Sequence, residues 1–440
     1  MSDFGLHLHL GDYKSEPIKV HGGGFEKVNL ITGMKGGGKS HIAKGIIAES
    51  LKAGMSTVVF DINNEYDQVS ENAIILKPGI NLKFRLDFME METLFRLFER
   101  LAPFPEKTAY SVSAKLPKMM AEYTKHNKEY VKQGKEENIP DIEYLKNLEN
   151  QVIQGSANNE AIKNMRMGYK RSLEIVDSYG LIMSQGEART EDKFIRKKTQ
   201  VEKVVFSLRS VFNDIFLGTP QVLVFQIGGL RNQVQKVILS LVIDHLKQSC
   251  NKQTEAYHSY LKTGVNPLPP EFPRYPIYPT VFFEEAHMYM DTRDIDDLIP
   301  IIRHIGINAF FVTNTPGALP ESVFRLLDNL IMTRMVNRKD IDRVADCGLT
   351  DKETIIGFAN NLKEHHALFL SAKDGATKNF PLVFHVRDFG LPRSGETRSQ
   401  WKAMSKVKQA QQQDNDSIAD RQQSKSESAS SKPKRKRSAK

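Results

Sequence analysis

Cysteine is scarce in this sequence of 440 residues, with only Cys250 and Cys347 present. The pair shows no metal-binding spacing, and two thiols exclude a disulfide framework for most of the fold. No run of about 18 apolar residues occurs, so no membrane segment is expected. The first residues also lack a basic stretch followed by an apolar one, which is the pattern of a secretory signal. We therefore expect a cytoplasmic protein.

Net positive charge is nearly missing from the body of the chain, although the net charge of the whole sequence is +9. Residues 391–440 hold 13 Lys and Arg against 5 Asp and Glu, a net of +8, which leaves +1 for residues 1–390. The total charge is therefore weak support for nucleic-acid binding by the body itself. This last segment is rich in Gln, Ser, Lys and Asp and poor in large apolar residues, so we predict a disordered basic tail.

The run from Lys432 to Arg437 in this tail is densely cationic. Three interpretations stay open: non-specific contact with DNA phosphates, a nuclear localisation signal in a eukaryotic or viral host, or a solubilising terminus.

The alternation of strand and helix patterns predicts an α/β fold with a mostly parallel sheet. An apolar strand over residues 27–32, a glycine-rich loop, a helix over 40–53 and a buried strand over 57–61 form a β–loop–α–β unit. Residues 89–215 show helical spacing, and strand patterns return in residues 216–390. We therefore expect one core formed by residues 1–88 and 216–390, interrupted by a helical insertion over 89–215.

The glycine-rich loop matches the phosphate-binding pattern G-x-x-x-x-G-K-[ST] without deviation. Glycines let backbone amides approach a phosphate closely, and the following helix directs its positive end toward the same group. Lys39 is expected to reach the β- and γ-phosphates, and the Ser40 hydroxyl to ligate Mg²⁺. The predicted residues for binding ATP are Gly33, Met34, Lys35, Gly36, Gly37, Gly38, Lys39, Ser40 and His41.

Two adjacent carboxylates, Glu284 and Glu285, follow the apolar stretch from Thr280 to Phe283. Enzymes with this loop need an acidic group at such a strand end to hold Mg²⁺ through water. The next carboxylate can then orient and deprotonate the attacking water. We assign Glu284 to the magnesium shell and Glu285 to the catalytic base.

Three further residues are candidates for contact with the γ-phosphate. Asn314 ends another apolar strand, where its side chain would lie beside that phosphate or the attacking water. Arg303 and Arg334 are candidates for an arginine supplied to the nucleotide of a neighbouring subunit, a contribution that raises the rate by about 10³–10⁵.

Together these features resemble the HerA/FtsK superfamily of ring-forming ATPases, and its HerA-like members in particular. The resemblance is carried by the loop from Gly33 to Ser40, by Asp61 to Tyr66, by Phe283 to His287, and by Gly306 to Asn314. Two departures stand out. The family usually has Gln where Asn314 stands, and the residues before Lys27 are too few for the N-terminal β-barrel of HerA proper.

The resemblance implies a RecA-like core, a hexameric ring with nucleotide between subunits, and ATP-driven movement of double-stranded DNA. A nuclease or another effector is a further partner that it suggests. A hypothesis of a different class is that ATP gates the assembly of a multi-protein complex, such as a defence complex, with slow turnover that is indifferent to DNA.

Overall fold

Eleven strands form one mixed sheet in the computed structural model, which describes residues 7–25, 27–133, 139–156, 158–197, 205–372 and 381–391. Across the sheet the order is β2-β1-β11-β10-β9-β3-β8-β7-β4-β6-β5. The strands are β1 (His7–Tyr13), β2 (Glu16–His21), β3 (Val28–Thr32), β4 (Thr57–Asp61), β5 (Ile74–Leu76), β6 (Val222–Gln226), β7 (Thr280–Glu284), β8 (Asn308–Thr313), β9 (Asn329–Met332), β10 (His366–Ser371) and β11 (Leu382–Val386).

The half of the sheet from β9 to β5 is parallel throughout, and β10, β11, β1 and β2 extend it with antiparallel pairs. The predicted α/β fold with a mostly parallel sheet is therefore confirmed. Strands β3, β4 and β7 are buried along their whole length. A strand buried on both faces reads as a continuous apolar run, which is why the sequence revealed these three.

Helices connect the parallel strands and cover both faces of the sheet. They are α1 (Lys39–Lys52), α2 (Met91–Leu101), α3 (Glu106–Lys132), α4 (Ile142–Asn147), α5 (Glu149–Val152), α6 (Glu160–Ser178), α7 (Gln185–Lys197), α8 (Leu208–Phe216), α9 (Asn232–Thr263), α10 (Thr292–Ile305), α11 (Glu321–Arg325), α12 (Arg338–Ala345) and α13 (Lys352–Asn361). Short 3₁₀ turns are η1 (Gly22–Phe25), η2 (Leu86–Phe88), η3 (Ala286–Met288) and η4 (Pro316–Ala318).

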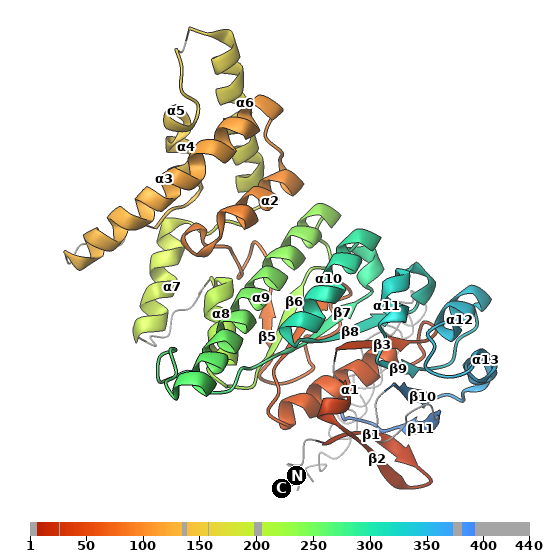
Figure 1. The fold of residues 1–440 in the computed structure, drawn as a ribbon. Coiled ribbons are helices and arrows are strands. Elements are labelled where there is room, and N and C mark those ends of the chain that lie inside the picture. Colours follow the sequence, from red (N-terminus) through yellow and green to blue (C-terminus); the bar gives the residue numbers. More distant parts are fainter. Residues whose placement is uncertain are drawn as a thin grey trace, which may run out of the picture. The chain divides into compact units, whose positions relative to one another are not determined.

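The two faces of the sheet bury separate hydrophobic clusters, because successive side chains of a strand point to opposite faces. On one face, Ile42 and Ile46 of α1 pack with Val59 of β4. On the other face, the apolar sides of α9 and α10 pack with alternate residues of the same strands, such as Phe60. Figure 1 shows α1 and the pair α9 and α10 with the sheet between them.

Residues 89–215, expected to form a helical insertion, comprise α2 to α7 and most of α8, between β5 and β6 in the chain. Helix α2 packs against α9, where Arg96 forms an ion pair with Asp244 (3.1 Å) and Arg100 pairs with Asp294 of α10 (3.1 Å). The insertion is therefore anchored on the face of the sheet opposite α1 (Figure 1). The predicted disordered tail lies outside the described residues, apart from Leu391.

Candidate active site

The carboxyl ends of β3, β8, β7 and β4 lie side by side at one edge of the sheet. Ligands of parallel α/β sheets bind at this edge, because the loops that leave the strands converge there. The glycine-rich loop follows β3, Asp61 ends β4, Glu284 ends β7, and Thr313 ends β8. Four stretches far apart in the sequence thus meet around one point.

The loop after β3 requires glycine at several positions. Gly36 and Gly38 have φ angles of 77° and 93°, in the left-handed region where a side chain is strained. At Gly33, with φ 152°, a Cβ atom would lie 1.8 Å from Oγ1 of Thr333. The loop therefore follows a backbone path that needs glycine at these three positions.

Lys39 lies near the end of this loop, where α1 begins, and is 8% exposed. Its Nζ donates to the carbonyl oxygen of Met34 (3.1 Å), so the side chain curls back over the loop. Burial lowers the pKa of the Lys39 ammonium, and the carboxylates of Glu285 and Glu284 oppose that shift. The lysine therefore lies where it interacts both with the loop and with the acidic pair.

Glu284 is 3% exposed at the end of β7 and faces Asp61 at the end of β4. Burial, followed by the nearby carboxyls of Asp61 and Glu65, raises the pKa of Glu284 well above its ordinary value. Burial also raises the pKa of Asp61, although its carboxyl accepts the backbone N–H groups of Glu65 (3.1 Å) and Tyr66 (3.0 Å). Like charges so close together disfavour double ionisation. Oε2 of Glu284 accepts no hydrogen bond from the described residues.

Glu285 has a different environment. Its backbone is left-handed (φ 47°), a conformation that costs a non-glycine residue about 1–3 kcal/mol and that clusters at functional sites. The carboxylate accepts the hydroxyl of Thr313 (2.7 Å) and the amide of Asn314 (3.3 Å to each oxygen). Nδ1 of His287 lies 3.6 Å from Oε2 of the same carboxylate. Glu285 is thus hydrogen-bonded from β8, whereas Glu284 faces β4.

The remaining predicted residues are distributed over both edges of the sheet. Asn314 is half-buried beside Glu285. Arg334 follows β9 at the loop edge; its side chain is exposed and its carbonyl oxygen accepts the amide of Met34 (2.8 Å). Arg303 lies in the last turn of α10, with Nη1 3.5 Å from the carbonyl oxygen of Leu326, near the amino ends of the strands. Of the two predicted arginines, Arg334 lies beside the loop and Arg303 lies at the opposite edge of the sheet.

Sequence reasoning missed three residues of this site. Asp61 was noted only as part of a motif, yet its carboxyl is buried against Glu284. Thr313 was likewise noted only within a motif, although it donates a hydrogen bond to Glu285, and Thr333, which lies against Gly33, was not singled out. A polar residue at the end of a buried strand is the shared signal, since such an end opens on the ligand edge.

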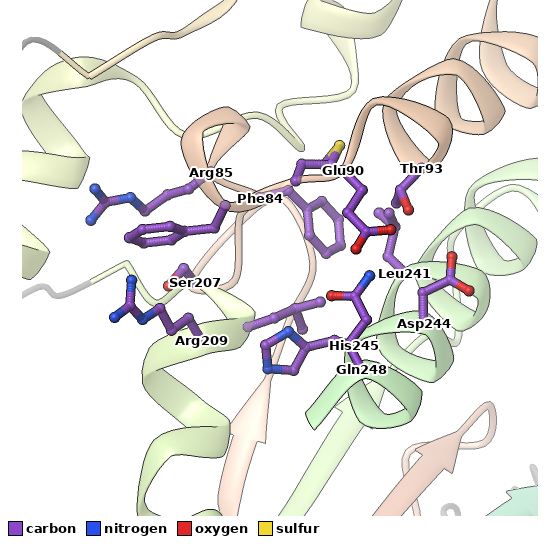
Figure 2. A pocket seen from close by; sticks show the side chains of 13 residues that line it. Phe84, Arg85, Glu90, Thr93, Ser207, Arg209, Leu241, Asp244, His245 and Gln248 are labelled. Atoms are coloured by element: carbon purple, nitrogen blue, oxygen red, sulfur yellow. The ribbon is translucent and has the colours of Figure 1, made fainter. Parts of the chain in front are cut away.

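A small pocket of about 50 Å³ lies elsewhere, between the segment after β5, α8 and α9. Figure 2 shows Arg85, Arg209 and His245 around it. The ring of Phe88 lies between the guanidinium groups of Arg85 (4.3 Å) and Arg209 (4.4 Å). Arg85 is buried and also pairs with Asp192 of α7 (2.5 Å). None of the residues at the carboxyl edge lines this pocket, which belongs to the attachment of the insertion.

The family model of the central domain of the helicase HerA matches residues 9–246. This match spans more than half of the chain, so the chain belongs to that family, whose members are HerA/FtsK-type P-loop ATPases. The resemblance found in the sequence is therefore confirmed, and the fold is a RecA-like P-loop NTPase core. No curated protein sequence matches the chain.

Several solved structures are similar to this chain at low sequence identity. VirB4 of Thermoanaerobacter pseudethanolicus is 14% identical over 87% of this chain and 97% of that one, with a TM-score of 0.49. The unbound bacterial conjugative coupling protein TrwB is 12% identical over 88% and 92%, with a TM-score of 0.47. The genome packaging NTPase B204 of Sulfolobus turreted icosahedral virus 2, with AMPPCP, is 11% identical over 82% and 98%, with a TM-score of 0.35.

Two absences hold for the part of the chain that the structure describes. No helix there has the length and apolar character needed to cross a lipid bilayer. No group of three or more His, Cys, Asp or Glu side chains is arranged to ligate a metal ion. The second absence is compatible with magnesium, which is usually held by one or two protein ligands together with water and substrate phosphates.

Proposed function

We propose that this HerA/FtsK-type P-loop ATPase hydrolyses ATP with Mg²⁺ and uses the energy to move double-stranded DNA through a homo-oligomeric ring, most simply a hexamer. One observation carries the proposal: Lys39, Glu284 and Glu285 converge at the carboxyl edge of the sheet, within reach of each other's charge. This trio supplies a phosphate-binding cation, an acid for the metal shell and a base for the water.

The loop from Gly33 to Ser40 fits the triphosphate of ATP. Added Cβ atoms would meet no atom within 4 Å at Gly36 and Gly38, so open space lies beside these two backbone positions. The N-terminal amides of α1 and the ammonium of Lys39 favour negative charge at the same place. His41, half-buried in the first turn of α1, stays a predicted contact to the nucleotide.

Ser40 and Glu284 are the residues that would hold magnesium. The Ser40 side chain is half-buried at the start of α1, and Oε2 of Glu284 is buried with no hydrogen-bond donor among the described residues. Hard cations prefer oxygen ligands, and an unsatisfied buried carboxyl oxygen is suited to a metal-bound water. When bound, the ion neutralises charge that develops on the phosphates. Its positive charge would also favour the ionised form of Glu284.

Glu285 is suited to act as the general base. The hydroxyl of Thr313 donates to Oε2 (2.7 Å), whereas among the described residues Oε1 has only the longer contact with the amide of Asn314 (3.3 Å). Oε1 is therefore the oxygen that can accept a proton from an attacking water. In a ring, Arg303 or Arg334 would add positive charge to the nucleotide of the neighbouring subunit, and Asn314 would contact the γ-phosphate.

Family membership supports DNA as the substrate, since the matched domain is that of a helicase. The body of the chain carries a net charge of only +1, so attraction to DNA must come from a local stripe inside the ring or from the basic tail. A nuclease or another effector would be a further partner.

Phosphate release with and without duplex DNA tests the proposal, run on the wild type, Lys39→Ala and Glu285→Gln. We expect duplex DNA to stimulate hydrolysis, and both variants to lose at least about 100-fold in rate. Lys39→Ala removes the cation that stabilises the phosphate charge in the transition state, and Glu285→Gln removes the base. Lys52→Ala is the matched control, since Lys52 lies at the far end of α1 with its side chain 69% exposed. Its activity should equal that of the wild type.

A mass measurement with a slowly hydrolysed ATP analogue, run beside this assay, tests the ring. A monomer under all conditions would contradict the ring, and hydrolysis that no form of DNA stimulates would contradict translocation. Slow turnover indifferent to DNA, together with assembly driven by the analogue, would instead favour the nucleotide-gated assembly module.

A further inference from the structure

A chain of hydrogen bonds runs from the carboxylate of Glu285 toward the surface along the end of β8. Oγ1 of Thr313 lies 2.7 Å from Oε2 of Glu285 and 3.3 Å from Nδ1 of His287. Nε2 of His287 lies 3.0 Å from Oγ1 of Thr315. The amide of Thr315 also donates to Oγ1 of Thr313 (3.1 Å), and the imidazole of His287 is 21% exposed.

The direction of each hydrogen bond in this series follows from counting the donors and acceptors. An ionised carboxylate only accepts, so the single proton of the Thr313 hydroxyl points at Glu285. Oγ1 of Thr313 then has two lone pairs, and the amide of Thr315 occupies one of them. The other must accept a proton from Nδ1 of His287, which leaves Nε2 of a neutral imidazole to accept the hydroxyl of Thr315. Every polar group of the set is thereby satisfied in one arrangement.

This arrangement matters because Glu285 has few other restraints. Its backbone is left-handed. Among the described residues, the other contacts of its carboxylate are the 3.3 Å ones with the amide of Asn314 and the 3.6 Å one with Nδ1 of His287. A carboxylate free to rotate would present either oxygen to water, whereas a bond at 2.7 Å fixes Oε2 and leaves Oε1 for the reaction.

We propose that Thr313, His287 and Thr315 form a positioning relay that orients Glu285 for proton abstraction. Thr313 contacts the base directly, and His287 and Thr315 act through Thr313. The inference rests on the proposed role of Glu285 as the general base. It assigns to His287, Thr313 and Thr315 a role in turnover and not in nucleotide binding.

Steady-state ATP hydrolysis by Thr313→Val, Thr313→Ser and His287→Ala tests the relay. Valine has the shape of threonine without the hydroxyl, so we expect kcat to fall at least about tenfold while KM changes less than about twofold. Serine retains the hydroxyl and should restore most of kcat. His287→Ala should lower kcat, and His287→Asn, which keeps an amide N–H near the position of Nδ1, should recover part of it.

Thr57→Val is the matched control, because Thr57 is a buried threonine at the amino end of β4 whose hydroxyl has no partner among the described residues. Its kcat and thermal unfolding should match the wild type. In a Glu285→Gln background, Thr313→Val should change the residual kcat by less than about twofold, since a positioning residue acts only through its base.

The outcomes separate the relay from the proposed function. If Glu285→Gln keeps its activity, the general base is misassigned. If Glu285→Gln is inactive while Thr313→Val has the kcat of the wild type or a higher one, the relay is refuted. Equal losses of kcat in Thr313→Val and Thr313→Ser would also overturn it, because the shared hydroxyl would then be irrelevant.

Discussion

Replacing Glu284 with Gln should stabilise the protein in the absence of nucleotide and magnesium. The carboxyl is 3% exposed, Oε2 accepts no hydrogen bond from the described residues, and burial together with Asp61 raises the pKa of Glu284 well above its ordinary value of 4.5. A neutral amide of the same shape needs no proton to stay neutral, so it avoids the cost of keeping a buried acid protonated at neutral pH. Sites built to hold a cation commonly reduce stability in this way.

The raised pKa of Glu284 determines how the free energy of unfolding changes with pH. Above pH 4.5 the Glu284 carboxyl loses its proton in the unfolded chain but keeps it in the folded protein. The folded state then binds more protons, so the free energy of unfolding falls as pH rises, by up to about 1.4 kcal/mol per pH unit for one group. The fall ends at the folded-state pKa. Asp61, whose pKa is also raised, adds a contribution of the same sign.

Urea unfolding followed by circular dichroism measures this effect, with a chelator present, at about pH 5 and about pH 8. Glu284→Gln should differ little from the wild type at the lower pH and be clearly more stable at the higher one. Glu285→Gln is the control: it removes the next charge, but that carboxylate is hydrogen-bonded to Thr313, so it should lose about 1 kcal/mol. If the free energies of unfolding of Glu284→Gln and the wild type changed equally with pH, the reasoning would be refuted.

Two further substitutions test the loop and the insertion. Gly33→Ala should abolish binding of a fluorescent ATP analogue, because its Cβ would lie 1.8 Å from Oγ1 of Thr333; Gly357→Ala, in α13 with open space around it, should bind normally. Arg85→Ala should lower the free energy of unfolding in urea by about 3–5 kcal/mol, because it leaves the buried Glu191 and the half-buried Asp192 without their cation. Arg293→Ala, at a side chain 92% exposed, should change it by less than about 0.5 kcal/mol, and equal effects would contradict the buried network.

The phosphate loop and the acidic pair could be read from the chain because their chemistry is contiguous. Gly33 to Ser40 needs its glycines, lysine and serine at fixed spacing in one turn, and the burial of β7 on both faces makes the run before Glu284 apolar. The same local patterns revealed the parallel strands that position these residues. Short strands such as β5, with three residues, were missed because so few positions show no periodicity.

The tertiary structure alone decided which strand ends meet. Asp61 and Glu284 lie 223 positions apart in the sequence but at neighbouring strand ends, because β4 pairs with β7. Strand order likewise inserts β8 between β3 and β7, which brings Thr313 to Glu285, and places β9 beside β3, which brings Thr333 to Gly33. Lateral order in a sheet is set by packing over the whole core and has no local signature. The sequence therefore determined the reacting groups, and the sheet determined how they are held.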